Sequence, residues 1–474
     1  MYAFFDQLIG DINNVMYSYV LIIMLLAVGV YFTIRTKFVQ FRMLGESIRL
    51  TTEKSDNKKA VSPFQALMVS TASRVGTGNI VGVANAIAIG GYGAVFWMWV
   101  IALIGGASAF IESTLAQIYK KRDENGGSYG GPAYYIQGGL KQRWLGVIFA
   151  IALIATYAIG FNMLCSFNLV SSLSEYSFYG DPLTSKVPLI CGAILAVLVG
   201  FCVLGGGKRI VKVAGVLVPI MGVTYILMAL VVMVLNFKML PEVFRNIFVS
   251  AFDFKAIFGG FAGSALMHGI KRGLYSNEAG VGSAPNAAAS ADVTHPVKQG
   301  LVQMLSVFID TLLICTATAM MCLSGGLVPN ETLAGAPFVQ TALSVNFGSF
   351  GFYFVTVALL LFAFTTLIGN LFYCESCLNY LAKRTLRKWE MRVFYVIACI
   401  LVFLGAQMEF GMVWNLSDVI MGFMAIINLP VIVLLGKPAI RSLDDYVKQR
   451  KAGKNPVFQA KNIGLKDTTD FWQD

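Results

Sequence analysis

The sequence has few charged residues and lacks the patterns that common catalysts share. Only 13% of its 474 residues are charged, whereas a soluble domain has about 25%. A water-soluble fold of this size would not have enough polar surface to cover itself. The sequence has two histidines, neither with partners at metal-ligand spacing, and it contains no Walker A, H-E-x-x-H or nucleophile-elbow pattern. These absences argue against an enzyme and against transport driven by ATP.

Two further features are missing. No lysine or arginine precedes Asp6 and Asp11, so the N-terminus does not resemble a cleavable signal peptide. The eight cysteines follow no metal-binding pattern, and the C-x-x-C pair Cys374 and Cys377 falls on an expected helix. Cysteines in such apolar segments are typical of small buried side chains.

Long apolar blocks dominate what is present, because 57% of the residues are hydrophobic. Blocks of about 20 apolar residues predict helices that cross a bilayer. The sequence therefore predicts an all-α integral membrane protein that contacts lipid. Eleven spans are expected, near 17–36, 64–89, 92–117, 144–170, 187–204, 213–235, 256–270, 298–323, 347–373, 391–408 and 411–436.

The basic residues predict the orientation of these spans. With the N-terminus outside, the alternate loops assigned to the cytoplasm hold 31 of the 36 lysines and arginines, as expected for cytoplasmic loops. The net charge of +11 is thus explained by topology, and no nucleic-acid partner is needed. The C-terminus is expected in the cytoplasm, and the basic tail after residue 436 is expected to have little order.

The spans also predict an internal repeat. When the first span is set aside, ten remain, and glycine and polar residues interrupt the first span of each set of five, 64–89 and 256–270. Because five is odd, the two halves cross the membrane with opposite polarity, which is the plan of many secondary transporters. The predicted parts are an N-terminal helix and loop (1–60), two five-helix repeats (61–235 and 236–436) and a cytoplasmic tail (437–474).

The first interruption is the V-G-T-G-N run at 75–79. Each glycine costs about 1 kcal/mol relative to alanine inside a helix, and freed backbone groups at this depth must be buried in protein or line a cavity. Carbonyls at the end of the first half-helix, at Ala72, Arg74 and Val75, would face a cation, and the next amides suit a carboxylate. Thr77 and Asn79 add oxygens that suit Na+. Close helix packing through small residues is the alternative interpretation.

The second interruption is expected at 258–264, F-G-G-F-A-G-S. The same argument applies there, with Phe261 as a candidate lid over the aliphatic part of a small substrate. Thr365 and Thr366 offer hydroxyls that can supplement carbonyls around a cation. In the alternative interpretation, which the sequence alone favours, these hydroxyls bond back to their own helix.

Arg74 is the only basic residue in the middle of a predicted span, away from its ends. A buried charge needs a partner or a water-filled vestibule, and an ion pair that only fixes helix packing is an equal alternative. Asp310, next to Thr311, is the acid expected nearest the ion pathway. The candidate partners of Arg74 are Glu112, Asp310, Glu375 and Asp418.

Three stretches resemble the alanine or glycine:cation symporter family, the sodium-coupled amino-acid carriers of prokaryotes. The similarity extends from about residue 15 to 440. The stretches are S-P-F-Q-A (62–66) leading through V-G-T-G-N-I (75–80) to G-A-V-F-W-M-W (93–99), G-G-P-A-Y-Y-I (130–136), and K-R-G-L-Y-S-N-E-A-G-V-G-S-A-P (271–285) followed by F-I-D-T (308–311).

The resemblance implies a LeuT-type fold of five plus five helices with one extra N-terminal helix. It also implies a Na+ ion held by carbonyls of Ala72 and Val75 together with Thr365 and Thr366. Asn79 would serve a second ion or position the substrate.

For the substrate, the resemblance implies that amides of Gly76, Thr77, Gly78 and Asn79 meet the carboxylate. Polar groups near Phe261 and Ser264 would meet the amine. The S-N-E-A-G run at 276–280 is interpreted as a gating or structural element outside the pocket.

One motif departs from the family pattern N-M-x-Q-[SA]-N. This chain has Cys165 at the glutamine position and Phe167 at the asparagine position, which leaves the identity of the amino acid open. The expected function is import of a small neutral amino acid such as alanine or glycine, coupled to Na+, across the inner membrane by alternating access. The alternatives are a carrier for glutamine or another neutral amino acid, coupling to H+ through Asp310, and a channel or substrate sensor.

Overall fold

The computed structural model describes residues 2–53, 60–123, 126–181, 184–253, 264–330, 333–408, 410–465 and 469–472. Within these ranges helices, joined by turns and loops, make up the regular structure apart from one short hairpin. In this hairpin β1 (Lys121–Arg122) pairs antiparallel with β2 (Ser128–Tyr129). The predicted all-α class is confirmed.

Seven described helices are long and apolar enough to cross a membrane by length and composition. Several of them contain a π-helical turn between two α-helical parts. The seven are Gln7–Arg35, Gly93–Ile118, Arg143–Ser171, Gly207–Leu235, Pro296–Leu323, Ser349–Ala382 and Val413–Lys451.

The α-helices follow one another in this order. The first half contains α1 (Tyr2–Val15), α2 (Ile22–Arg35), α3 (Val39–Arg42), α4 (Leu44–Thr51), α5 (Pro63–Arg74), α6 (Val83–Gly90), α7 (Gly93–Ile118), α8 (Pro132–Tyr135), α9 (Arg143–Ile154), α10 (Phe161–Ser171), α11 (Val187–Val203) and α12 (Gly207–Leu235). The second half contains α13 (Leu240–Ala251), α15 (Ala265–Asn277), α16 (Pro285–Ala288), α17 (Pro296–Phe308), α18 (Thr316–Leu323), α19 (Gly335–Phe347), α20 (Ser349–Ala382), α21 (Lys388–Gly405) and α22 (Phe410–Lys451).

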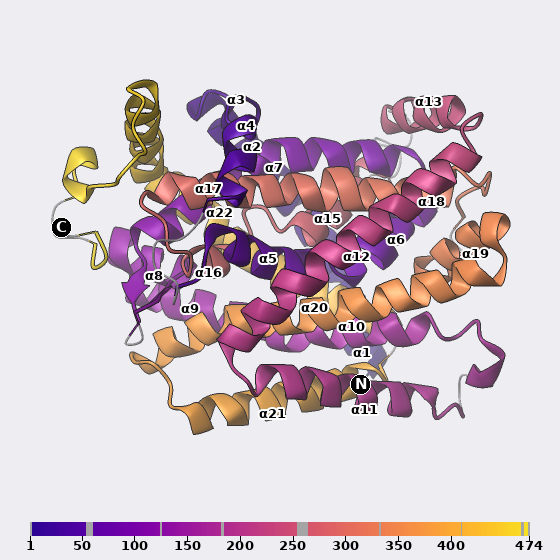
Figure 1. The fold of residues 1–474 in the computed structure, drawn as a ribbon. Helices are drawn as coiled ribbons and strands as arrows, with labels where there is room; N and C mark the ends of the chain where they lie inside the picture. The colour runs from indigo at the N-terminus through magenta and orange to yellow at the C-terminus, as the bar shows by residue number, and fades with distance from the viewer. Residues whose placement is uncertain are drawn as a thin grey trace.

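The long helices lie side by side in one bundle (Figure 1). Helices α13 and α19 lie at one end of it, and α8, α16 and the C-terminal segment lie at the opposite end (Figure 1). In the interior, α7 packs against α15 and α17, and α20 packs against α5, α10 and α12. Helices α5 and α15, which hold the site described below, are therefore enclosed by other helices.

Apolar side chains cover the outside of the bundle. Val197 and Phe201 of α11 and Val234 of α12 are more than 70% exposed to the surroundings of the bundle. Many polar side chains, Asn79 and Asp310 among them, are fully buried. An apolar exterior around a polar interior is the distribution expected of a protein whose solvent is lipid.

Helix α15 corrects the predicted positions of two basic residues. Lys271 and Arg272 were expected in a cytoplasmic loop, but α15 continues to Asn277 and both side chains are buried in it. Lys271 Nζ lies 2.9 Å from an oxygen of Asp418, and Arg272 donates two hydrogen bonds of 3.0 Å to the same carboxylate. Because these charges are paired inside the bundle, they do not indicate which side of the membrane a loop occupies.

The C-terminal tail is ordered, so the expectation of little order is wrong. Helix α22 continues to Lys451, and the chain then returns to the bundle. Phe458 N–H donates to Thr294 O at 2.9 Å, and the Phe458 ring packs edge-on against His295. Trp472 Nε1 donates to Gln117 O at 2.8 Å. Backbone and aromatic contacts therefore fix a segment whose composition is polar and basic.

Gly269 sets the distance between α15 and α7. A Cβ atom added there would lie 2.4 Å from Ala94 O and 2.6 Å from Trp97 Cβ, closer than real carbon atoms approach. The two helices pack together at this separation because the residue has no side chain.

We expect Gly269→Ala to destabilise the protein by about 1–3 kcal/mol, because α15 must move away from α7 to admit the methyl group. Gly215→Ala in α12 is the matched control, since an added Cβ there meets nothing within 4 Å. Thermal unfolding of both variants in detergent checks this. Equal midpoints for the two variants would contradict it.

Candidate functional site

The first predicted interruption is present between α5 and the π-helical turn Gly78–Gly82. Helix α5 begins with a capping box between Ser62 and Gln65 and ends at Arg74. Val75 then takes ψ 83°, which turns the backbone out of the helix. The helical path resumes at Gly78 and continues into α6.

The interruption redirects the backbone groups that a continuous helix would have paired. Gly76 N–H, which would close the next helical turn on the Ala72 carbonyl, donates instead to Asn79 Oδ1 at 2.8 Å. The Ala72 carbonyl accepts a hydrogen bond from Thr366 Oγ1 of α20 at 3.2 Å. A carbonyl oxygen and a hydroxyl oxygen thus converge beside the end of α5, and such oxygen donors suit a hard cation.

Both glycines of the V-G-T-G-N run permit close contacts. A Cβ on Gly76 would lie 2.2 Å from Thr366 Oγ1, and one on Gly78 would lie 2.3 Å from Tyr275 Cε1. Any side chain at either position would therefore displace α20 or α15. Close packing and an open backbone, treated above as alternatives, occur here together.

The second interruption that the sequence predicts, at 258–264, stays a prediction. Residues 254–263, which include Phe261 and most of the predicted run, lie outside the described residues. Ser264 caps the start of α15 by accepting from Met267 N at 3.2 Å. Because α15 has 13 residues and rises 1.5 Å per residue, about 20 Å separates Ser264 from the other end of this helix.

The described interruption of this half follows Asn277. Glu278, Gly280 and Gly282 adopt φ of 53°, 85° and 92°, and α16 begins at Pro285. The interpretation of this run as a gating or structural element outside the pocket stays a prediction. A glutamate followed by two spaced glycines and a proline was the signal that could have located the break.

The two interruptions meet at Asn79. Asn79 Nδ2 donates to Ser276 Oγ at 2.9 Å and to Asp310 Oδ1 at 2.7 Å. Ser276 Oγ also donates to Asp310 Oδ2 at 2.6 Å, as does Thr311 Oγ1 at 2.9 Å. Asp310 therefore lies next to the first interruption, as expected, and Ser276, which was not predicted, joins the ends of α5 and α15.

The backbone of the second interruption is held by buried side chains of distant helices. Gly280 N–H donates to Glu112 Oε1 of α7 at 3.2 Å, and Gly280 O accepts from Asn428 Nδ2 of α22 at 2.9 Å. Ser283 Oγ donates to Glu278 Oε2 at 2.6 Å. Polar groups freed from α15 thus have partners inside the protein, as a buried unwound segment requires.

Arg74 lies between the interruptions but pairs with none of its candidate acids among the described residues. Its Nη1 donates to the hydroxyl of Ser306 and, at 3.5 Å, to Gln303 O. Glu375 bonds instead to Tyr395, and Asp418 pairs with Lys271 and Arg272.

The motif that departs from the family pattern faces the first interruption. Thr77 Oγ1 donates to Cys165 Sγ at 3.6 Å and accepts from Asn168 Nδ2 at 3.0 Å. Asn162 Oδ1 accepts from Asn370 Nδ2 of α20 at 3.0 Å. Cys165 was predicted here, whereas Asn168 and Asn370 were not, because nothing in a single sequence indicates which faces of α10 and α20 meet.

Thr365 and Thr366 point in different directions. Thr366 Oγ1 reaches Ala72 O, whereas Thr365 Oγ1 bonds back to Leu361 O at 3.0 Å and Phe362 O at 3.2 Å. Thr365 therefore bonds back to its own helix, whereas a role of Thr366 beside a cation stays a prediction.

The fold, with its seven long apolar helices, is that of a multi-pass membrane protein. A solved structure, MhsT in complex with L-phenylalanine, aligns with a TM-score of 0.55 at 16% identity, over 82% of this chain and 96% of that one. This likeness concerns the fold.

The sequence comparisons define the family. The pattern of the sodium:alanine symporter family matches residues 2–460. The chain belongs to this family. It is 45% identical over 460 residues to the probable sodium/glutamine symporter GlnT of Bacillus subtilis, covering 97% of this chain and 94% of GlnT. It is 37% identical over 456 residues to the sodium/alanine symporter AgcS of Methanococcus maripaludis, covering 94% of this chain and 98% of AgcS.

We expect Thr366→Val to weaken Na+ binding about tenfold, because the hydroxyl beside the Ala72 carbonyl is lost. Thr365→Val is the matched control and should leave the Na+ affinity within about twofold, because the Thr365 hydroxyl bonds to carbonyls of its own helix and not to Ala72 O. Binding of radioactive sodium to the purified variants measures both. A Thr366→Val protein with wild-type affinity would exclude this hydroxyl as a ligand.

Proposed function

We propose that the protein is a Na+-coupled symporter that imports a small neutral amino acid, such as alanine or glycine, across the inner membrane. The observation that carries the proposal is the junction at Asn79, where two interrupted helices present their ends to one another. Helix ends of opposite polarity in one buried place suit a zwitterion and a cation.

Each helix end has a role in this proposal. The carbonyls of Ala72 and Val75 at the end of α5, together with Thr366, would hold Na+. The amides from Gly76 to Asn79 would receive the substrate carboxylate at the start of the next half-helix. The substrate ammonium would meet polar groups near Phe261 and Ser264 or the carbonyl end of α15.

A proposed topology accompanies this function. Adding the two interrupted helices, α11 and α21 to the seven long spans gives eleven crossings, with the N-terminus outside and the C-terminal segment in the cytoplasm. The two repeats would be 61–235 and 236–436, preceded by 1–60 and followed by the tail 437–474. Both interruptions fall on the first helix of a repeat, which supports this inverted arrangement.

Coupling would follow from the shared junction. Na+ at the end of α5 and the substrate at the start of the next half-helix would stabilise the same turn, 75–79. Each ligand would then raise the affinity for the other by the same factor. Alternating access would expose the loaded junction to one side of the membrane at a time.

Glutamine is the second candidate substrate. Two observations favour it, the identity to the relative named as a sodium/glutamine symporter and the position of Cys165 at the Thr77 hydroxyl. Because a thiol is smaller than the glutamine side chain of the family pattern, a larger substrate would have more room beside Thr77. Coupling to H+ through Asp310 is the corresponding alternative for the ion.

We expect proteoliposomes holding the purified protein to accumulate labelled alanine when a Na+ gradient is imposed. Without Na+, uptake should fall to the level of protein-free vesicles. Competition by glycine and glutamine at two pH values identifies the substrate, and separates Na+ from H+ coupling. Alanine uptake that is the same with and without Na+ under every condition would contradict the proposal.

The same vesicles separate a carrier from a channel or a sensor. A carrier accelerates uptake when unlabelled substrate is loaded on the opposite side, whereas a pore does not. The absence of any substrate flux, with binding retained, would instead identify a sensor.

A further inference from the structure

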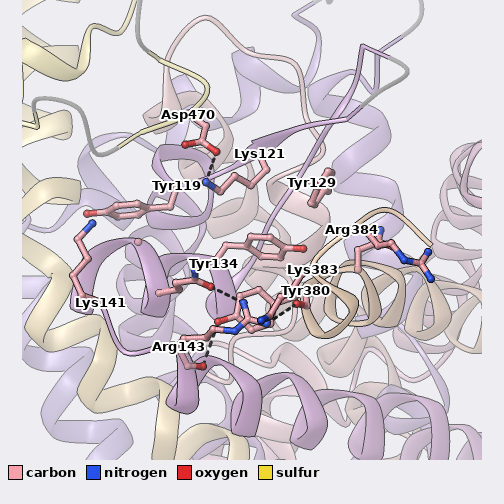
Figure 2. Close-up of a pocket in the computed structure, with 13 residues that line it drawn as sticks. Tyr119, Lys121, Tyr129, Tyr134, Lys141, Arg143, Tyr380, Lys383, Arg384 and Asp470 are labelled. Atoms are coloured by element: carbon pink, nitrogen blue, oxygen red, sulfur yellow. Dashed lines mark hydrogen bonds and ion pairs between the residues drawn. The ribbon is translucent and has the colours of Figure 1, made fainter. Parts of the chain in front are cut away.

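A basic cavity lies away from the interruptions, at the end of the bundle where the C-terminal segment docks. Its volume is about 640 Å³. The walls come from the end of α7, the β1–β2 hairpin, the α8 region, the start of α9 and the end of α20. Figure 2 shows basic side chains on both sides of it, with Lys121 and Asp470 above.

The charge of this cavity is mostly of one sign. Five lysines and arginines line it, and Asp470 is the one acid among its lining residues. Arg384 is engaged by Glu390 and Lys121 by Asp470. Lys141 and Lys383, in contrast, form no ion pair or side-chain hydrogen bond with any residue in the described ranges. The cavity therefore presents uncompensated positive charge.

The two uncompensated lysines occupy unusual backbone positions. Lys141 has φ 61° and Lys383 has φ 59°, and each directly follows the end of a helix. Glycine is the usual residue in this left-handed conformation at a helix end, because a side chain there costs about 1 kcal/mol. Both positions carry a lysine despite that cost, and both lysine side chains line the same cavity.

Two exposed tryptophans lie at helix ends close in sequence to the cavity wall. Trp144 follows Arg143 of the cavity wall at the start of α9, and Trp389, five residues after Arg384 of the wall, lies at the start of α21. Their side chains are 62% and 59% exposed. Exposed tryptophans at helix ends are typical of the boundary between membrane and water. An anion held by the lysines could thus belong to a lipid or arrive from solution.

We infer that this cavity binds a negatively charged phosphate group. Lys141 and Lys383 supply the free charge, and the tyrosine-lined wall at Tyr134 and Tyr380 packs against the rest of the ligand. Asp470 of the C-terminal segment competes for Lys121. Because Lys121 and Asp470 are both about half exposed, their pair is weak and an anion can displace it. This inference does not depend on the transported substrate.

Two probes distinguish the sources of the phosphate. The first is phosphatidylglycerol titrated into the purified full-length protein in detergent, with phosphatidylcholine of the same acyl chains as reference, and bound lipids counted by native mass spectrometry. The second is inorganic phosphate or AMP, measured by calorimetry. Preference for phosphatidylglycerol assigns the cavity to lipid, and binding of a soluble probe assigns it to a free phosphate compound.

The double variant Lys141→Ala with Lys383→Ala should bind whichever probe the wild-type protein binds at least tenfold more weakly. Each lysine removed takes away one positive charge that attracts the phosphate group. Asp470→Asn should bind it more tightly. Lys208→Ala with Lys212→Ala removes the same charge from exposed residues outside the cavity and is the matched control. Thermal unfolding verifies that all variants remain folded.

The inference is overturned by any of three results. The first is equal binding of both lipids with no binding of phosphate or AMP. The second is a double variant that binds as the wild type does. The third is an equal loss in the Lys208 and Lys212 control, which would attribute the effect to net charge.

Discussion

Peptide groups that leave a helix inside a membrane need partners within the protein, and in this chain Asn79 supplies one for the turn after α5 while its side chain also contacts Ser276 of α15. Its Oδ1 accepts from Gly76 N–H, while its Nδ2 donates to Ser276 and Asp310. One amide side chain therefore stabilises the turn after α5 and ties it to the end of α15. An unpaired buried amide would cost several kcal/mol in this environment, so the open backbone depends on this contact.

The surrounding helices maintain the same arrangement from outside. Glu112 and Asn428 hold Gly280 from α7 and α22, and Gly76 and Gly78 admit α20 and α15 to contact distance. Thr366 reaches the freed Ala72 carbonyl only because position 76 has no side chain. The proposed ion site and the proposed substrate site thus share one turn of backbone, which is the physical basis for coupling them.

Some of this was predictable from the sequence and some was not. Two glycines beside Asn79 located the first interruption correctly. The break after Asn277 was not predicted, because Lys271 and Arg272 resembled the end of a span. Those charges are tolerated inside the bundle because Asp418, 146 residues beyond Arg272, pairs with them. Such a pairing between distant residues is not visible in a single sequence.

Adjacent residues and the tail illustrate the same limit. Thr365 and Thr366 differ by about 100° around one helix, so only the rotation of α20 against α5 decides which hydroxyl meets Ala72. Composition indicated a polar tail with little order, yet Phe458 and Trp472 anchor it to His295 and Gln117. A few aromatic contacts to distant segments outweigh the average character of that stretch.

The most direct test of the shared turn is the mutual dependence of the two ligands at equilibrium. Alanine affinity of the purified protein is measured over a range of Na+ concentrations, and Na+ affinity over a range of alanine concentrations. The account predicts that each ligand tightens the other by the same factor. Affinities that are independent of one another would contradict it.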